Sequence, residues 1–443
     1  MLFGAPIARR SRAAAAAAAA RRRCLWVAAT SSAAELSAAV EQCAEDIRKA
    51  VSGTSALEPA SRDACLVFIT PTYPASSIDG ITSSVSQALR GVSPAVDVIG
   101  TVVDRVNGGR SGVSLLFHSS RDTAAGTPAV PFFMGDEHGR QRLRETAVGR
   151  WHTRATDRQA ALPQSATQAT SSVRLPAELA AIRDPSSIRL LLLASDHETR
   201  QTSDALAQRF PRASILGMVG AATPFLNARP YTLLGPTTVH GSGCVGLAFP
   251  DRPASLSVAH PGMVAATPVL RIARAKGNVV LDVEDARAAH SLIAAMRSGG
   301  SGDHRVYARI SRTREAALTP LLCPGPMSSV FRVTGGDPAK GGVAVDTLSD
   351  IPPGCFIQFL VSPAAPSAAQ PGLETGSRLN VVFGVSCDSG SDSDSTNSTQ
   401  AQLSAASEGG FVYSYPGKCA GGTDLFSGST ECDVPNSTAT LSL

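Results

Sequence analysis

Two short segments contain the residue types that most often carry out chemistry. Gly241–Gly246 reads GSGCVG and matches the G-x-G-x-x-G pattern of dinucleotide-binding loops. That pattern needs a helix after it, because the pyrophosphate lies on the amides of a helix N-terminus. Here an apolar strand follows instead, and Pro250 soon ends it. The sequence therefore predicts a glycine turn that leads into a strand, rather than a nucleotide site.

The second segment is Ser195-Asp196-His197-Glu198, directly after an apolar run. Its carboxylates and imidazole could bind a metal ion. However, Ser195 and Glu198 also have the spacing of a capping box for the helix that follows. We favour the capping interpretation, and we expect neither a metal ion nor a cofactor.

Isolated histidine and cysteine residues complete the reactive set. His118 ends a predicted strand, His240 adjoins the glycine turn, and Cys387 lies where a strand opens into an acidic serine tract. The sequence shows no G-x-S-x-G elbow and no Ser-His-Asp order that would support hydrolysis. A thiol at a strand end can be partly exposed, and its pKa then decides its reactivity. A thiol or redox enzyme that uses Cys387 is therefore one open alternative.

Helices and strands that alternate along the chain must position these residues. Leu36, Val40, Cys43, Ile47 and Val51 recur every three or four residues and predict an amphipathic helix over 31–52. Short apolar runs predict buried strands, with a weaker helix at 76–92 between the first two. These strands are expected at 65–70, 97–103 and 112–119.

The same order of elements recurs later, with a strand at 189–195, a helix at 196–210, and strands at 213–219 and 244–250. VIG ending at Gly100 aligns with ILG ending at Gly217, and VSLLF at Val113–Phe117 aligns with VGLAF at Val245–Phe249. We therefore predict a duplicated strand-helix-strand-strand unit. It forms an α/β domain of mixed α+β character.

The expected domain boundaries follow from changes in hydrophobic pattern and turn composition along the chain. The duplicated domain covers 60–258, and residues 121–187 inside it lack a persistent period and are predicted to be an inserted linker. From about residue 259, short strands alternate with glycine and proline turns, and Gly277-Asn278 marks a hairpin. This predicts a mixed-sheet carboxy-terminal domain over 259–443. Residues 24–59 are expected to form the amphipathic helix and a connector.

Composition excludes several function classes. Of the 443 residues, 43% are hydrophobic and 17% are charged, which excludes a wholly disordered chain. The 40 basic and 36 acidic residues nearly balance, and aromatic residues make up only 5%, so no nucleic-acid partner is predicted. Apolar runs of about 20 residues are missing from the sequence, so no membrane insertion is predicted.

The first 23 residues differ from the rest. They contain six arginines and no acidic residue, which is typical of a mitochondrial transit peptide. Without these arginines the remaining chain is slightly acidic. We therefore predict a mitochondrial matrix protein, with a cytoplasmic protein as the alternative.

Several segments together resemble the FIST domain family, a sensory and signal-transduction module with amino-terminal and carboxy-terminal parts. The amino-terminal likeness lies in LVFIT, VIG, LLLLAS, FPRASILGMVG and GCVGLAF. The carboxy-terminal likeness lies in TPVLRIARAKGNVVLDVEDARAAHSLI, FRVTGGDPAKGGVAVDTLSDIPPGCFIQFLVS, NVVFGVSC and GGFVYSYPGK. The sequence departs from the family at Asp388-Ser389-Gly390, at Gly417-Lys418 and in the 121–187 insertion.

The resemblance implies a non-enzymatic sensory protein that binds a small ligand, with an amino-acid-like metabolite as the candidate. A cleft between the two halves is the expected pocket. The candidate ligand-binding residues are Gly100, Asp104, His118, Gly217, His240 and Cys387. Relatives that join FIST to an F-box make a protein-interaction adaptor in ubiquitin-dependent turnover a second alternative. LPAELAAI at Leu175–Ile182 leaves no room for the three helices of an F-box, so we interpret it as linker.

Overall fold

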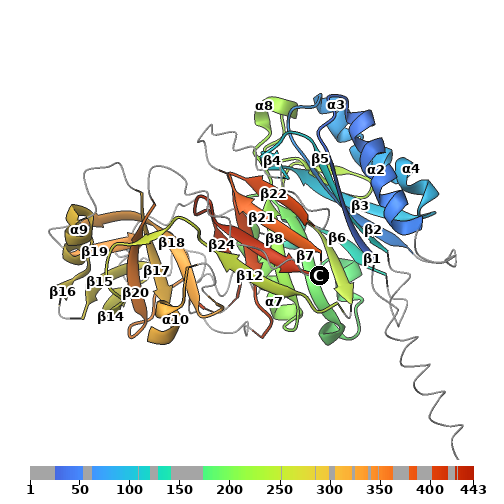
Figure 1. Ribbon diagram of the computed structural model, residues 1–443. Coiled ribbons are helices and arrows are strands. Elements are labelled where there is room, and N and C mark those ends of the chain that lie inside the picture. The colour runs from blue at the N-terminus through green and yellow to red at the C-terminus, as the bar shows by residue number, and fades with distance from the viewer. Residues whose placement is uncertain are drawn as a thin grey trace, which may run out of the picture.

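The computed structural model describes residues 25–52, 62–107, 109–119, 128–140, 173–250, 252–284, 286–298, 305–321, 325–337, 341–347, 349–362, 379–386, 402–417, 425–426 and 428–443. Three expectations fall outside these residues: the leader 1–23, the middle of the predicted linker, and Cys387 with the acidic tract after it. The described chain forms a body of three sheets and a closed barrel (Figure 1). Its helices and mixed sheets confirm the predicted α/β fold of mixed character.

The first sheet of the body is formed mainly by the first repeat. Its strand order is β1-β5-β2-β3-β9-β10, and β2 and β3 are parallel. Each residue of β2 is buried, as its continuous apolar run predicts. Helices α2 and α4 cover the outer face of this sheet (Figure 1). The elements are β1 Leu25–Ser31, α2 Leu36–Ser52, β2 Asp63–Ile69, α3 Ala75–Asp79, α4 Ile81–Ala88, η1 Leu89–Gly91, β3 Val96–Val102, β5 Val113–Ser119, β9 Leu233–Leu234 and β10 Val239–His240.

The second sheet repeats this arrangement, in the order β24-β23-β8-β7-β11-β6. Strands β7 and β8 are parallel, and β11 pairs with both β7 and β6 as β5 pairs with β2 and β1. The elements are β6 Val130–Met134, η3 Asp136–His138, α6 Ala177–Ala180, η6 Pro185–Ser187, β7 Ile188–Ser195, α7 Thr199–Arg209, β8 Ser214–Val219, α8 Pro224–Asn227, β11 Cys244–Pro250, β23 Phe411–Ser414 and β24 Thr430–Cys432.

Sheet register shows the duplication and corrects its alignment. Gly100 lies opposite Val67 in the first repeat, and Gly217 lies opposite Leu193 in the second. The next strand places Leu115 opposite Val67 but Gly246 opposite Leu193. Leu115 therefore corresponds to Gly246, one residue away from the expected match with Leu247. A shift by one residue exchanges the two faces of a strand. The sequence match of VSLLF with VGLAF therefore does not reflect structural equivalence.

The remaining strands form a third sheet and the barrel. The third sheet has the order β12-β25-β21-β22-β4. In the barrel, β20, β14, β15, β19, β18 and β17 pair in sequence, and β17 pairs back to β20, which closes the ring. The elements are β4 Arg105–Val106, β12 Ser255–Ala259, β13 Val264–Ala265, β14 Leu270–Lys276, β15 Val279–Val283, β16 Ala286–Arg287, α9 Ala288–Ser298, β17 Val306–Ser311, α10 Arg314–Leu318, β18 Ser328–Asp337, β19 Gly342–Val345, β20 Phe356–Val361, β21 Asn380–Val385, β22 Gln402–Ser407 and β25 Thr438–Ser442.

Three expected boundaries need correction. The carboxy-terminal domain does not run unbroken from 259 to 443, because β22 pairs with β4 and β23 pairs with β8 in the body. Strand β1 makes residues 25–31 part of the first sheet rather than a connector. The predicted linker contains β6, which completes an edge of the second sheet. In each case a segment without a clear sequence signal pairs with the edge of a sheet, and that edge exists only in the folded body.

The body has an apolar core that its three sheets share. It joins the inner faces of the first and second sheets to the third sheet, and Phe68 of β2 meets Phe383 of β21 edge-on at 5.2 Å. Separate cores lie under α2 and α4, under α7, and inside the barrel. None of the described helices is long and apolar enough to cross a membrane.

Candidate functional site

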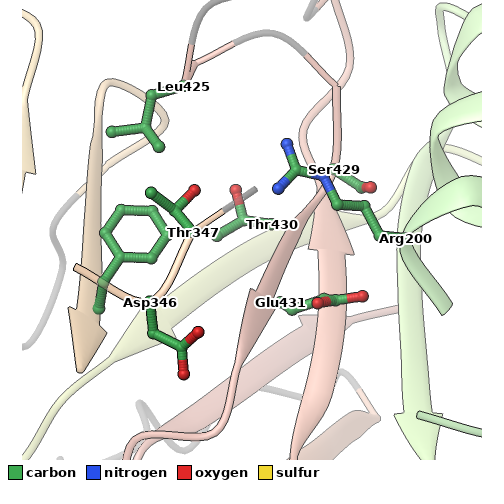
Figure 2. A pocket seen from close by; sticks show the side chains of 8 residues that line it. Arg200, Asp346, Thr347, Leu425, Ser429, Thr430 and Glu431 are labelled. Atoms are coloured by element: carbon green, nitrogen blue, oxygen red, sulfur yellow. The ribbon is translucent and has the colours of Figure 1, made fainter. Parts of the chain in front are cut away.

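A small cavity of about 70 Å³ lies where the second sheet of the body faces the barrel (Figure 2). Its walls come from the start of α7 and from β24 on the body side, and from β18 and the end of β19 on the barrel side. Cavities at such junctions are common ligand sites. The lining residues are Arg200, Phe331, Asp346, Thr347, Leu425, Ser429, Thr430 and Glu431.

Arg200 connects the two sides of this cavity. Its Nη2 donates to Ser349 Oγ, on the loop after β19, and its Nε lies 3.5 Å from Asp204 Oδ2, one helical turn along α7. Asp204 in turn accepts hydrogen bonds from the Ser429 amide at 2.7 Å and from the Ser429 hydroxyl at 2.6 Å. The guanidinium is therefore held in place by the protein, and Figure 2 shows it directed from α7 toward Thr430.

Two carboxylates line the same cavity. Burial raises the pKa of the Glu431 carboxyl; Arg200 opposes this rise, and the neighbouring carboxylate of Asp204 adds to it. Burial also raises the pKa of Asp346, with a contribution from Asp433. Glu431 and Asp346 are both exposed residues at the mouth of the cavity, so access to solvent limits how far either pKa rises.

The rest of the lining is mixed. Thr347, Ser429 and Thr430 supply hydroxyls, and Phe331 and Leu425 supply apolar surface. One guanidinium, two carboxylates, hydroxyls and an apolar wall can together bind a small molecule that has both charged ends and an apolar part. Among the described residues, neither a thiol nor an imidazole lines this cavity.

None of the five described residues predicted as ligand contacts lines this cavity. Gly100 and Gly217 lie on the helix-covered faces of their sheets, and each makes room for a neighbour. A Cβ at Gly100 would come within 2.0 Å of the Val67 carbonyl oxygen, and a Cβ at Gly217 within 2.8 Å of the Val412 side chain. These glycines therefore allow close packing of their neighbours, and neither lies in the lining of this cavity.

His118 lies in the shared core instead of a pocket. Its ring contacts those of Trp26 and Phe249, at centroid distances of 4.4 and 5.0 Å. Burial, with a contribution from Arg252, lowers the pKa of His118 to about 3, so the imidazole is neutral at physiological pH. The strand end that holds His118 is covered by Phe249 of the second repeat, away from the cavity.

Asp104 and His240 are also occupied by neighbours in their own chain. The Asp104 carboxylate accepts from the Glu408 amide at 2.6 Å and from the Ser386 hydroxyl at 3.0 Å, and so joins the first repeat to the third sheet. His240 stacks on Phe133 at 3.5 Å, and burial lowers the pKa of its imidazole. Asp104 lies beside Ser386, the residue before Cys387, but neither it nor His240 reaches the cavity.

The two motifs singled out first form one structural unit. Asp196 Oδ2 accepts from the Gly243 amide at 2.6 Å, while the Ser195 hydroxyl donates to the Gly243 carbonyl. The carboxylate also pairs with buried Arg140 at 2.6 Å and accepts from the Glu198 amide at 3.0 Å. The expected capping box is therefore wrong, because Asp196 takes the amide and Ser195 bonds elsewhere. The expected turn into a strand is confirmed by Gly243, with φ +113°, and by β11.

The described cysteines show little capacity for thiol chemistry. Cys43, Cys65, Cys244 and Cys432 are free thiols, and each is buried, as is Cys355. Burial raises the pKa of Cys43, Cys244 and Cys432 to about 12, which keeps the unreactive thiol form at neutral pH. Within the described ranges, no group of three His, Cys, Asp or Glu side chains is placed to hold a metal ion.

Sequence reasoning missed the lining residues because their signals were weak. Arg200, Ser429 and Glu431 fall in a polar helix and in a tail segment without a motif. One available signal was Arg200 with Asp204, a spacing of four residues that indicates an ion pair on a helix face. Comparison with known proteins adds no relative: no family model matches the chain, and no curated protein matches it.

Proposed function

We propose that this protein is a FIST-type sensory protein that binds a small, amino-acid-like metabolite in the cavity between α7, β24 and the barrel. The observation that carries the proposal is a single cavity lined by a fixed guanidinium, two carboxylates and an apolar wall. The resemblance of the sequence segments to the FIST family supports a sensory role. No catalytic step is part of the proposal.

The geometry suggests how such a ligand would lie. Arg200 would pair with the ligand carboxylate, because a guanidinium offers several donors to a carboxylate. Asp346 would pair with the ammonium group, and Phe331 with Leu425 would contact the apolar part. Since the walls belong to the body and to the barrel, a bound ligand would strengthen the contact between them. That change in coupling would be the signal.

Thermal unfolding of the full-length chain tests this proposal. Saturating ligand stabilises only the folded state, so a panel of amino acids and related amines should contain members that raise Tm. The variant R200Q should lose that rise, while R297Q, at the exposed end of α9, should keep it. The ligand-free Tm of R200Q is measured alongside, because Arg200 also bonds Ser349. A panel without any shift would rule out the proposal.

The leader supports a proposed site of action in the mitochondrial matrix. A fluorescent reporter fused to residues 1–40 should then colocalise with mitochondria. A diffuse cytosolic signal would contradict this part of the proposal, while leaving the ligand-binding part to the thermal assay.

A further inference from the structure

The charges around the cavity do not balance. Asp346 and Glu431 line it, and Asp433, two residues after Glu431, adds a third carboxylate whose charge raises the pKa of both. Asp204 lies behind Arg200 and also raises the pKa of Glu431. Four carboxylates therefore gather here from three segments: α7, β24 with Asp433 after it, and the end of β19.

Among the lining residues Arg200 is the one positively charged side chain, and it is already engaged. Arg200 is held by Asp204 and Ser349. Arg332, on β18, lowers the pKa of Asp346 but does not line the cavity. A neutral zwitterion would leave the excess negative charge in place, and an anionic ligand would add to it. A ligand with an additional positive charge would relieve the repulsion.

We infer that the cavity selects a basic amino acid with a primary amine on its side chain, so that two ammonium groups meet Asp346 and Glu431 while the carboxylate meets Arg200. This inference rests on the proposed function and narrows its ligand class. Each carboxylate can accept several hydrogen bonds, so the α7 amide that lowers the Glu431 pKa still leaves acceptors for an ammonium group. The methylene chain of such a ligand would lie against Phe331 and Leu425, the apolar part of the lining.

An organic cation fits this cavity better than a metal ion. The lining offers hydroxyls and apolar side chains as well as carboxylates. A metal site would gather three or more ligating side chains, and the described residues form no such group. The ring of Phe331 is also compatible with a primary ammonium group, because an aromatic face attracts cations.

Isothermal titration of the full-length chain with matched ligands tests the inference. Lysine and norleucine share a carbon skeleton and differ by the terminal amine. One charge-assisted hydrogen bond changes affinity by about tenfold or more, so lysine and ornithine should bind at least about tenfold tighter than norleucine. Glutamate should bind more weakly still.

The possible outcomes distinguish the inferred ligand class, a basic amino acid, from the broader proposal that the protein binds an amino-acid-like metabolite. Norleucine binding as tightly as lysine would overturn the inference and leave the proposed function standing. An absence of binding for all four amino acids would overturn the inference, and a flat thermal panel would overturn the proposed function as well. Tight binding of glutamate would also contradict the inference.

A variant pair assigns the selectivity to the cavity. D346N removes one charge at the mouth without changing the shape of the side chain, and should reduce the ratio of lysine to norleucine affinity severalfold. E178Q, on exposed α6, is the matched loss of charge elsewhere and should keep the ratio. An unchanged ratio in D346N, with norleucine affinity and Tm also unchanged, would count against the assignment.

Discussion

The rings of His118 and Phe249 lie 5.0 Å apart, and the two residues occupy equivalent positions in the two repeats. His118 lies opposite Ala64 on β2, and Phe249 lies opposite Leu190 on β7, the same place in each register. The indole of Trp26 contacts both rings, at 4.4 and 4.9 Å. A polar ring and an apolar ring thus fill one layer of the shared core, where the two repeats meet.

Replacing His118 by phenylalanine should therefore stabilise the protein. Neither ring nitrogen of His118 has a hydrogen-bond partner among the described residues, and a buried polar group without a partner costs about 1–3 kcal/mol. We expect H118F to raise the free energy of unfolding by about 1–3 kcal/mol in urea titrations, with ligand binding unchanged. H290F, at an exposed position of α9, is the control and should shift it by less than about 0.5 kcal/mol. Loss of binding in H118F would restore a ligand role for this residue.

Two buried histidines predict acid sensitivity. Burial lowers the pKa of His118 and of His260 to about 3, against 6.5 for an exposed imidazole. Between pH 6.5 and 3 the unfolded chain thus binds more protons than the folded chain, so the free energy of unfolding rises with pH. This stabilisation is complete above about pH 6.5 and is lost as the pH falls toward 3. Urea titrations at several pH values should show this slope, and it should be shallower in H118F; equal slopes would contradict the prediction.

The sequence predicted those parts of the fold that depend on local burial. Strands β2 and β7 each contain a continuous apolar run because both of their faces are covered, and α2 buries the predicted stripe of residues. Strands β1 and β6 were missed for a different reason. LWVAATS and VPFFM are short, and each is held by one neighbouring strand that sequence cannot place beside it.

The cavity could not have been predicted in the same way. Arg200, Asp346 and Glu431 come from three distant segments, and none has a distinctive neighbour in sequence. By contrast, Gly100 and Gly217 stood out in the alignment of the repeats. Residues shared by the two repeats are those that the packing of both copies requires. The cavity lies beside the second repeat, so comparing the repeats does not reveal its lining residues.

Gly100 should tolerate no side chain. The Val67 carbonyl that a Cβ would meet is backbone of the adjacent parallel strand and cannot rotate away. We expect G100A to lower the free energy of unfolding by about 1–3 kcal/mol or more, because overfilled cores strain their neighbours. G335A on β18, where a Cβ meets nothing within 4 Å, should be nearly neutral. Equal stability of G100A and wild type in urea titrations would refute this interpretation.

Asp196 should be one of the most sensitive polar residues. Removing its charge would leave Arg140 buried without its closest partner, and such a change costs about 3–5 kcal/mol. D196N should therefore lower thermal and urea stability far more than D282N. Asp282 pairs with Arg274 at 2.7 Å on the exposed surface, where an ion pair contributes less than about 1 kcal/mol. Similar losses in the two variants would show that burial does not set the cost.

The pairing of Val412 with Gly217 has a consequence for how the chain is made. Strand β8 is buried along its whole length, yet one of its edges pairs with β23, which is translated much later. A nascent chain therefore carries an open, apolar edge at β8 until residues 411–414 leave the ribosome, a long-range closure of the kind that slows folding. A stop codon before residue 411 would expose the edge of β8 in the second repeat, far from the lost residues in sequence.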